Sequence, residues 1–491
     1  MRPPVAWPVI VPVALVELGA LLVTGNRYGY HRDELYFLEA GKHPAFGYDD
    51  QPPLTPLIGR MSTALFGNDP RGLRTISALA VALLVILVAL IARELGAGHR
   101  GQFIVAVGAA LSFALFVGHL LSTTTFDLVL WVVIAWLVTR LLAGGDERLW
   151  LAVGFTVGVT LENKHLVLLL VAALTAGFAA SRVFQPLRSR WLWAGAVVAF
   201  ALWVPNLVWQ ARHGWPQLDL AHKIADEDPV GYRALLVPFQ FVAVPTLLAP
   251  VWLAGLRRLL RDDDSRRFRP LGYGYVALLA LSLVLGAKPY YTGGLLLVLL
   301  AAGGAPAERW LDRHAHGTEL LATAMALSAV TSIALALPVI PVDDVHATPV
   351  PALNEDTIES IGWPRFVATV AGVWNDLPTD QRTRAVILAG NYGEAGAIDR
   401  YGPDHGLPGA YSGHNNYARW GIPPGDDGPV IVLGWSRLEY LDGFFTGCVE
   451  AARIDNGVDI DNEEQGGPVW LCAAPSRPWS QLWPDLRHLS P

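Results

Sequence analysis

The chain has 491 residues, of which 53% are hydrophobic and only 16% are charged. Soluble domains carry about 25% charged residues, so this composition excludes an ordinary soluble protein and predicts a polytopic membrane protein. The net charge is only -7 and the basic residues are scattered among loops, which excludes a nucleic-acid-binding surface.

The first apolar segment, residues 5–23, is long enough to cross a bilayer core, which takes roughly 20 residues. Arg2 precedes it as in a signal peptide, but no small-residue cleavage site follows, so we expect a retained span. Ten further apolar segments follow, at residues 75–93, 103–121, 128–142, 149–161, 166–180, 191–209, 234–256, 271–286, 292–305 and 320–337. We therefore predict a mainly α-helical bundle with about eleven crossings.

Basic residues in the short loops predict the orientation, because such residues stay preferentially in the cytoplasm. Arginines fall on alternate connections, at residues 93–100, 140–148, 182–190, 257–269 and 309–313. This pattern places the N-terminus in the cytoplasm and puts the loop around Asp33 and everything after Pro338 outside. The excess of arginine over lysine in a chain rich in Ala, Gly and Pro indicates a bacterial source, so we expect the bacterial cytoplasmic membrane.

Two apolar segments near the lower length limit for a crossing flank the sequence Glu-Asn-Lys-His at residues 162–165. We expect a hairpin of short helices whose tip lies near the outer face. Charged groups at membrane depth cost about 2.5–3.5 kcal/mol each on insertion scales, so they usually line a cavity or pair. Lys164 and His165 are therefore candidate ligands of a substrate, and pairing of Glu162 with either of them is the alternative.

Residues 30–36 and 48–54 bring acidic groups to the outer membrane surface. Asp33 and Glu34 point about 100° apart on a helix, so one can act as a general base while the other orients a partner or a metal. They can also simply cap the helix. Asp50 precedes two prolines that stiffen the chain and fix the carboxylate, although a plain turn uses the same residues.

Further candidates lie on the same predicted side of the membrane. Asp127 begins an apolar helix and is either a third carboxylate of the site or an N-cap. Cations and phenols next to lipid suit the phosphate of a lipid headgroup, and the candidates are Lys288, Tyr290 and Arg212. Aromatic anchoring at the interface explains the tyrosine equally well.

From residue 343 onward the chain reads as a soluble domain. Apolar runs at residues 385–389, 430–433, 449–454 and 469–472 predict strands, and residues 364–376 and 394–401 predict helices. We therefore divide the chain into a membrane domain, residues 1–342, and an extracytoplasmic α/β domain, residues 343–491. Cys448 and Cys472 both lie in the second, so we expect a disulfide formed in an oxidising compartment, with two buried thiols as the alternative.

Two motifs of the C-terminal region carry residues that could bind a ligand. Glycines at residues 390, 393 and 396 follow a strand but lack the dinucleotide fingerprint, so they predict a strand-to-helix turn. His414, Asn415 and Tyr417 offer polar and aromatic faces that suit a sugar, which makes them candidate acceptor-binding residues. A Gly- and Asn-rich loop with packing aromatics is the alternative.

The combined set of residues resembles the lipid-linked-sugar glycosyltransferases of the GT-C type, in particular the protein O-mannosyltransferase and aminoarabinose-transferase superfamily, glycosyltransferase family 39. The resemblance covers roughly residues 5–340. It rests on the pair Asp33 and Glu34, on Pro-Pro-Leu after Asp50 and Gln51, on Asp127, and on Lys164 in a short hairpin. Some relatives have a lysine where this chain has Gln51, so that contact to the donor phosphate is missing here.

The resemblance implies a polyprenyl-phosphate sugar as donor and an extracytoplasmic glycan, lipid or protein hydroxyl as acceptor. Asp33 is then the general base, Lys164 contacts the donor phosphate, and Glu34, Asp50 and Asp127 orient acceptor or sugar. His165, Lys288 or Arg212 would replace the charge missing at Gln51. No cofactor is required by the sequence, although a divalent metal would be compatible with the carboxylates.

The chemistry is consistent by itself, because a phosphate leaving group needs cationic stabilisation and the attacking hydroxyl needs a base on the opposite side. The function predicted is therefore an inverting, membrane-embedded hexosyl or pentosyl transferase. A transporter or lipid flippase is the alternative, because ionisable residues at membrane depth also mark transport paths. A scaffold whose exported domain binds cell-wall glycan is a third interpretation.

Overall fold

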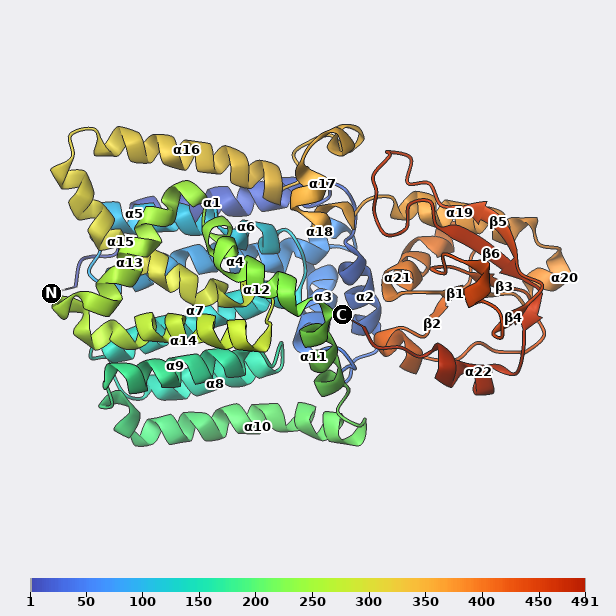
Figure 1. Ribbon diagram of the computed structural model, residues 1–491, viewed down its shortest axis with the longest axis horizontal. Helices are drawn as coiled ribbons and strands as arrows, with labels where there is room; N and C mark the ends of the chain where they lie inside the picture. Colours follow the sequence, from blue (N-terminus) through green and yellow to red (C-terminus); the bar gives the residue numbers. More distant parts are fainter. Residues whose placement is uncertain (1, 491) are drawn as a thin grey trace.

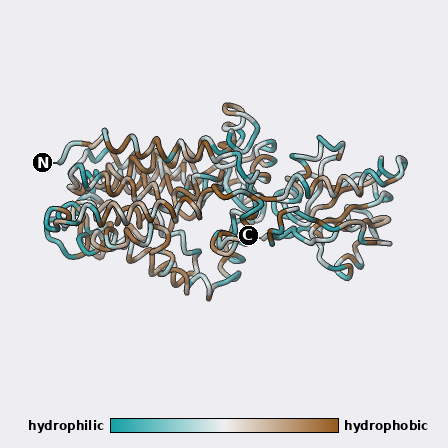
Figure 2. The backbone as a smooth tube through the Cα atoms, turned by 90° about the horizontal axis from the view of Figure 1, so that it is seen from above, coloured by the Kyte–Doolittle hydropathy of each residue, from teal (hydrophilic) through white to brown (hydrophobic). Residues whose placement is uncertain are grey.

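A computed structural model describes residues 2–490 of the chain, and Figure 1 shows it as two side-by-side parts. A long helical bundle holds the N-terminal two thirds of the chain. A smaller α/β unit, drawn in orange and red, packs against one end of the bundle. Figure 2 shows that apolar segments run along the bundle and that hydrophilic segments gather at its ends.

Seven helices of the described residues are long and apolar enough to cross a membrane. They are α1 (Trp7–Thr24), α4 (Pro70–Glu94), α7 (Thr123–Leu142), α10 (Arg190–Arg212), α14 (Arg269–Leu285), α15 (Gly293–Arg313) and α16 (Gly317–Ala336). An eighth span is bent by 80° between α12 (Pro229–Ala243) and α13 (Ala249–Arg261). The chain is therefore a multi-pass membrane protein.

The other three predicted crossings are shorter or interrupted. Residues 103–121 divide into α5 (His99–Ala110) and α6 (Phe113–Gly118), because the Ser112 side chain caps the second helix by accepting from the Ala114 amide. The predicted hairpin is formed by α8 (Leu149–Leu161) and α9 (Val167–Ser181). With the seven long helices and the bent span, these helices account for the eleven apolar segments predicted from the sequence.

Small residues allow the membrane helices to approach closely. A Cβ added to Gly154 of α8 would lie 2.0 Å from the Gly195 carbonyl oxygen of α10, so neither helix can carry a side chain there. Membrane helices lack a hydrophobic driving force between them and depend on such close packing. The helix α15 lies at the centre of the bundle and is buried from Gly293 through Ala305.

Two amphipathic helices, α2 (Arg32–Lys42) and α3 (Leu54–Phe66), lie between the bundle and the α/β unit (Figure 1). Near them, α11 (Pro216–Glu227), α17 (Val350–Leu353) and α18 (Glu355–Ile358) cover the same end of the bundle. The arginine-rich connections lie at the other end, beside the N-terminus. There Arg2 donates to the Ala143 carbonyl, and Arg100 pairs with Asp312 at 3.1 Å.

The α/β unit is built on a five-stranded sheet with the order β2-β1-β3-β6-β5. Its strands are β1 (Val386–Ala389), β2 (Tyr411–Ser412), β3 (Val430–Val432), β5 (Val449–Arg453) and β6 (Pro468–Cys472). The first three run parallel, and β6 is antiparallel to both β3 and β5. The helices are α19 (Trp363–Asp376), α21 (Tyr392–Tyr401) and α22 (Trp479–Leu486). All four predicted strands and both predicted helices are present.

The predicted turn from β1 into α21 begins at Gly390, and Gly393 and Gly396 lie in the first turns of the helix. Asn391 and Glu394 make a capping box at the start of that helix. A Cβ on Gly396 would lie 2.8 Å from the Leu35 Cβ, so this glycine lets α21 lie directly on α2. The turn therefore serves to join the α/β unit to the bundle.

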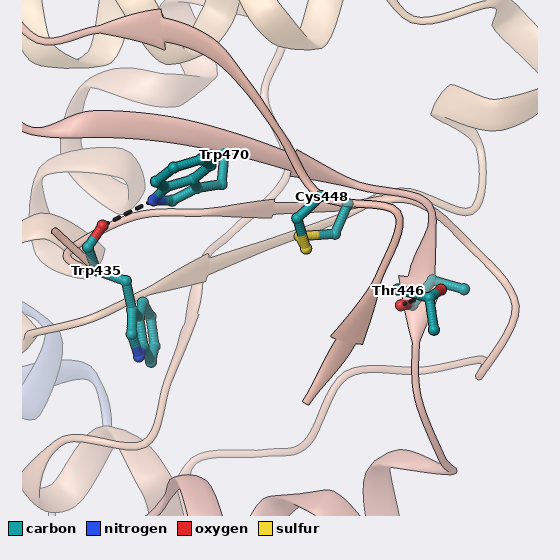
Figure 3. Close-up of a disulfide and its surroundings, with 6 residues drawn as sticks. Trp435, Thr446, Cys448 and Trp470 are labelled. Atoms are coloured by element: carbon teal, nitrogen blue, oxygen red, sulfur yellow. Dashed lines mark hydrogen bonds between the residues drawn. A yellow bond between two sulfur atoms is a disulfide. The ribbon is translucent and has the colours of Figure 1, made fainter. Parts of the chain in front are cut away.

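Cys448 and Cys472 form a disulfide, which lies where β6 ends beside the start of β5 (Figure 3). Cys472 is the last residue of β6 and is fully buried, whereas Cys448 lies between β4 (Phe445–Thr446) and β5. Nearby, the indole nitrogen of Trp470 donates to the Trp435 carbonyl at 2.7 Å (Figure 3). The cross-link closes a segment of the α/β unit with a sequence separation of 24 residues.

The connection between the two parts runs from the end of α16 at Ala336 to the start of α19 at Trp363. It lies over the end of the bundle and includes α17 and α18 (Figure 1). The division of the chain after residue 342 stays a prediction.

Candidate active site

The helix α2 begins with a capping box that fixes the orientation of Asp33 and Glu34. The His31 ring accepts from the Asp33 amide at 3.2 Å, and Glu34 reaches back to accept from the His31 amide at 2.9 Å. The two carboxylates then point in different directions, as the 100° step of a helix requires. Glu34 is turned into the bundle, and Asp33 is turned toward the α/β unit.

Glu34 is completely buried and its carboxylate is saturated. Arg74 of α4 donates to both of its oxygens, at 2.8 and 2.7 Å, and the Leu121 amide donates at 2.9 Å. The same guanidinium also donates to the carbonyls of Gly25 and Gly29. Because every oxygen is occupied, Glu34 anchors α2 to the bundle and has no free face for a sugar.

Asp33 is only half-buried and has one polar partner. The Tyr392 hydroxyl, from the first residue of α21, donates to Asp33 Oδ1 at 2.8 Å. No hydrogen bond to the other carboxylate oxygen is found among residues 2–490. Asp33 therefore offers a positioned carboxylate with a free oxygen, as a general base requires.

Asp50 lies beside this carboxylate in the connection between α2 and α3. The Tyr36 hydroxyl donates to Asp50 Oδ1 at 2.7 Å. Burial raises the pKa of Asp50 to about 7, the Tyr36 hydrogen bond opposes the rise, and the charges of Asp49 and Asp33 add to it. Asp50 is therefore poised to change its charge near neutral pH.

The adjacent carboxylate, Asp49, holds the connection in place. Arg419 of the α/β unit donates to both of its oxygens at 2.7 Å. From the bundle, Asn206 of α10 donates to the Phe46 carbonyl at 2.9 Å, and Gln217 of α11 donates to the Tyr48 carbonyl at 2.9 Å. The loop that carries Asp50 is thus fixed from two sides, as the two prolines after it indicated.

Lys164 lies at the tip of the α8–α9 hairpin on an aromatic platform. Its ammonium is 5.6 Å from the ring centre of Tyr290 and 5.1 Å from that of Tyr291. No carboxylate lies within ion-pair distance of it among the residues described. A cation held by ring faces but not neutralised by a carboxylate is suited to bind an anion.

Asp127 lies beneath the same two tyrosines in the first turns of α7. The Trp131 indole donates to Asp127 Oδ1 at 3.1 Å. Asp127 lines a cavity of about 10 Å³ together with Thr124, Tyr290 and Tyr291, which is room for about one water molecule. The cap of α7 is Ser122, whose side chain accepts from the Thr125 amide, so Asp127 is not the N-cap.

Asn163 shows that the lysine and the carboxylates lie at the same end of the bundle. Its side-chain amide donates to the Thr123 carbonyl at 2.8 Å, and its oxygen accepts from Thr55 at 2.7 Å. The Leu54 amide donates to the Glu162 carbonyl at 2.8 Å. The hairpin tip is therefore joined to the start of α3, four residues after Asp50.

The remaining cationic candidates for phosphate binding are His165, Lys288 and Arg212, and the first two are partly occupied by other contacts. His165 lies between the Trp203 indole at 3.0 Å and the Asn206 side chain at 3.1 Å. Lys288 lies 3.7 Å from Glu227, with its ammonium 5.8 Å from the Tyr232 ring centre. Arg212 is exposed at the end of α10, and no interaction among residues 2–490 links its side chain to the carboxylates. No ion pair joins Glu162 to Lys164 or to His165 among the described residues, and one oxygen of its carboxylate is buried without a hydrogen-bond partner.

The predicted acceptor residues are occupied by contacts within the α/β unit. His414 is stacked between Tyr392 and His488, with 4.7 Å between ring centres in each pair. Asn415 exchanges hydrogen bonds with the backbone of Ser490, and Tyr417 donates to Asp399 at 2.9 Å. All three are buried, which agrees with the packing alternative, and their role in acceptor binding stays a prediction.

Comparisons with known proteins fit this geometry. Residues 50–209 match the family model described as dolichyl-phosphate-mannose-protein mannosyltransferase. No curated protein matches the sequence. The chain is similar to the crystal structure of ArnT from Cupriavidus metallidurans bound to undecaprenyl phosphate, with a TM-score of 0.63, 13% identity and coverage of 96% of this chain and 99% of that one. The apo structure of that protein gives a TM-score of 0.58 and 12% identity over 95% and 98% of the two chains.

The chain has the GT-C glycosyltransferase fold. The resemblance to GT-C glycosyltransferases drawn from residues 5–340 is thereby confirmed, and the structural match extends to the α/β unit, for which no resemblance was predicted. The family match covers Asp50, Asp127 and Lys164 but not Asp33, which lies before its first residue.

Several residues of this candidate site could not have been found from the sequence. Asp356 of α18 lies with its carboxylate 3.8 Å from the His31 ring. The side chain is 58% exposed, so it forms the rim of the site. Tyr36, Tyr392 and Asp356 carried no local signal, whereas Arg74 gave one, as a basic residue near the start of a membrane helix.

The buried ion pair predicts a large loss of stability when one partner is removed. Arg74→Leu should lower the free energy of unfolding of the purified GT-C protein in detergent by roughly 3–5 kcal/mol, because it leaves Glu34 buried without its cation. Equilibrium unfolding measures this loss, and Arg71→Leu, at an exposed position one turn earlier, is the control. An equal effect of both variants would contradict the role given to Glu34 and Arg74.

Proposed function

We propose that the protein transfers a sugar from a polyprenyl-phosphate carrier to a hydroxyl group of an acceptor outside the cytoplasmic membrane. The observation that carries the proposal is that a half-buried carboxylate, Asp33, lies at the same end of the GT-C bundle as Lys164, a cation with no ion-pair partner among residues 2–490. The family match and the fold support it. ArnT, the protein of similar fold, binds undecaprenyl phosphate.

In this proposal Asp33 removes the proton of the acceptor hydroxyl. The Tyr392 hydrogen bond fixes one oxygen of the carboxylate and leaves the other free to take the proton. Asp50 lies beside it and orients the acceptor or the sugar through its own Tyr36 contact. The hydroxyl oxygen then attacks the anomeric carbon from the side opposite the phosphate, which inverts the configuration there.

Lys164 stabilises the leaving group. As the bond between the anomeric carbon and the phosphate oxygen breaks, negative charge grows on the phosphate, and an ammonium placed there lowers the barrier. The Tyr290 and Tyr291 platform holds this charge near the lipid, and Lys288 adds a second cation at the rim. The polyprenyl phosphate then departs into the bilayer, and the proton remains on Asp33.

The proposed orientation puts the α/β unit and the site outside the cytoplasm. Arginine-rich connections lie at the opposite end of the bundle, beside the N-terminus, as the positive-inside trend expects. The Cys448–Cys472 disulfide belongs to the proposed outer side, where thiols oxidise. We favour transfer over transport because the carboxylates and the cation of the site gather at one end of the bundle.

The overall proposal is tested by supplying reconstituted protein with a panel of radiolabelled polyprenyl-phosphate sugars and cell-envelope extract. Label should move from the lipid to a more polar product, with release of polyprenyl phosphate. Vesicles that accumulate or flip the intact lipid without cleaving it would instead favour a transporter.

Loss of the Asp33 charge should abolish transfer without unfolding the protein. Asp33→Asn keeps an oxygen that can accept from Tyr392 but removes the base, so the rate should fall by about 10²–10⁴-fold. Asp376→Asn, at an exposed position of α19, is the control and should transfer normally. Unchanged transfer by Asp33→Asn, in enzyme with the wild-type unfolding temperature, would refute the assignment.

Lys164 should determine use of the donor. Lys164→Gln removes a charged contact to phosphate, worth about 1.5–3 kcal/mol, so the kcat/KM for the donor should fall roughly 10–150-fold. Lys42→Gln removes an exposed lysine that pairs only with Glu39 on its own helix and serves as the control. An unchanged kcat/KM in Lys164→Gln would place the phosphate elsewhere.

The pKa of Asp50 predicts how the rate depends on pH. With a pKa of about 7, its ionised form predominates at pH 8 and its protonated form at pH 6. If the charge orients the acceptor, the rate should fall by roughly tenfold from pH 8 to pH 6. Asp50→Asn should show the low rate at both pH values, whereas an unaltered pH profile in that variant would assign the titration to another group.

A further inference from the structure

Three glutamates meet beside the first residue of α2, on the side of the helix away from the bundle. Glu359 follows α18, and Glu463 and Glu464 lie in the loop that leads into β6. One carboxylate oxygen from each of the three lies within 4.8 Å of the others. This glutamate cluster joins two segments of the chain that are about a hundred residues apart.

Glu464 is the unusual member of the glutamate cluster. Its side chain is only 7% exposed, and neither of its carboxylate oxygens has a hydrogen-bond partner. Burying a carboxylate without donors is costly, and such groups in proteins are normally paired or bind a metal. Glu464 therefore needs a positive partner that the described residues do not provide.

Arg32 compensates only part of the charge. Its guanidinium pairs with Glu359 at 3.4 Å and also with Glu463, but it makes no ion pair with Glu464. Three carboxylates and one guanidinium leave two negative charges when all are ionised. Glu394 adds a further negative charge nearby, although its carboxylate is bound to the turn before α21.

We propose that Glu359, Glu463 and Glu464 bind one calcium ion. The ligands are all carboxylate oxygens, which suit hard cations and exclude the metals that prefer histidine or cysteine. Ca²⁺ accepts six to eight oxygen ligands in a flexible geometry, whereas Mg²⁺ is usually held by one or two carboxylates and keeps its water. A charge of +2 neutralises the excess of the glutamate cluster.

The surrounding loop is suited to attract such an ion. Asp455, Asp459 and Asp461 are exposed on the same loop and add to the negative potential at its surface. Bound Ca²⁺ would connect this loop to the residue after α18, and Glu463 and Glu359 would remain in contact with Arg32. Because Arg32 precedes Asp33, the ion would stiffen the junction of the α/β unit with α2.

The test uses the purified full-length protein in detergent, stripped of metal with EGTA and containing neither donor nor acceptor. Equilibrium dialysis with ⁴⁵Ca²⁺ should show one saturable site per chain. Ca²⁺ should also raise the unfolding temperature, because a ligand that binds only the folded state stabilises it. The result is independent of whether the protein transfers sugars.

Glu464→Gln keeps the shape of the side chain and removes its charge. Calcium binding should weaken by at least about tenfold, the scale seen when even supporting groups of a metal site are lost, and the Ca²⁺-induced rise in unfolding temperature should disappear. Without Ca²⁺ this variant should be at least as stable as the wild type, because repulsion in the glutamate cluster is reduced. Glu439→Gln, at an exposed position after β3 and outside the glutamate cluster, is the matched control.

Glu463→Gln, at an exposed position of the same loop, should give the same loss of binding and covers the case in which Glu464→Gln fails to fold. Absence of a saturable Ca²⁺ site, or undiminished binding by both variants, would overturn the proposal and leave Glu464 as a buried protonated acid. Equally tight binding of Mg²⁺ at the same concentration would overturn the assignment of calcium.

Discussion

The buried ion pair between Glu34 and Arg74 is the contact on which the geometry of the site depends. A charge in the low-dielectric end of a membrane bundle is tolerated only when every one of its hydrogen-bonding positions is filled. Here the carboxylate receives donors from α2, α4 and the turn before α7, and the guanidinium also binds two carbonyls after α1. Four separate segments are thus fixed around one pair, and Asp33 is held one residue away.

The candidate site is shared between the bundle and the α/β unit. Aromatic rings pack across the contact between the bundle and the α/β unit. The ring centre of Tyr36 of α2 lies 4.8 Å from that of Tyr392 and 5.8 Å from that of Trp420. The hydroxyls of the first two tyrosines are the donors to Asp50 and Asp33. The α/β unit therefore supplies the hydrogen bond to Asp33 and packs against the tyrosine that binds Asp50, so it is more than an appended binding module.

The opposite half of the site uses a different physical arrangement. Lys164 lies against ring faces, which attract a cation without neutralising it, whereas Arg74 is neutralised by direct contact with Glu34. The contact with ring faces leaves the Lys164 ammonium available to a phosphate, whereas the Arg74–Glu34 ion pair holds the helices in place. The same distinction separates Asp33, which keeps a free oxygen, from Glu34, which has none.

The local pattern of the sequence was sufficient for the bundle, the short hairpin around Lys164, the strands of the α/β unit and the class of fold. Hydropathy, helix-length limits and strand periodicity act within about twenty residues, so a single chain displays them directly. The same information placed Asp33, Asp50, Asp127 and Lys164 at one end of the bundle, because alternate crossings must return to the same side.

The different roles of the residues at that end of the bundle were decided only by the tertiary structure. Asp33 and Glu34 are neighbours with similar chemistry, and what separates them is the arrival of Arg74 on one side and of Tyr392, 359 residues further along, on the other. In the same way, burial of His414 and Asn415 within the α/β unit, and the meeting of Glu359 with Glu464, follow from contacts between distant segments. Residue type and spacing determined which groups reach the membrane surface, while long-range packing determined which of them are satisfied and which remain free to act.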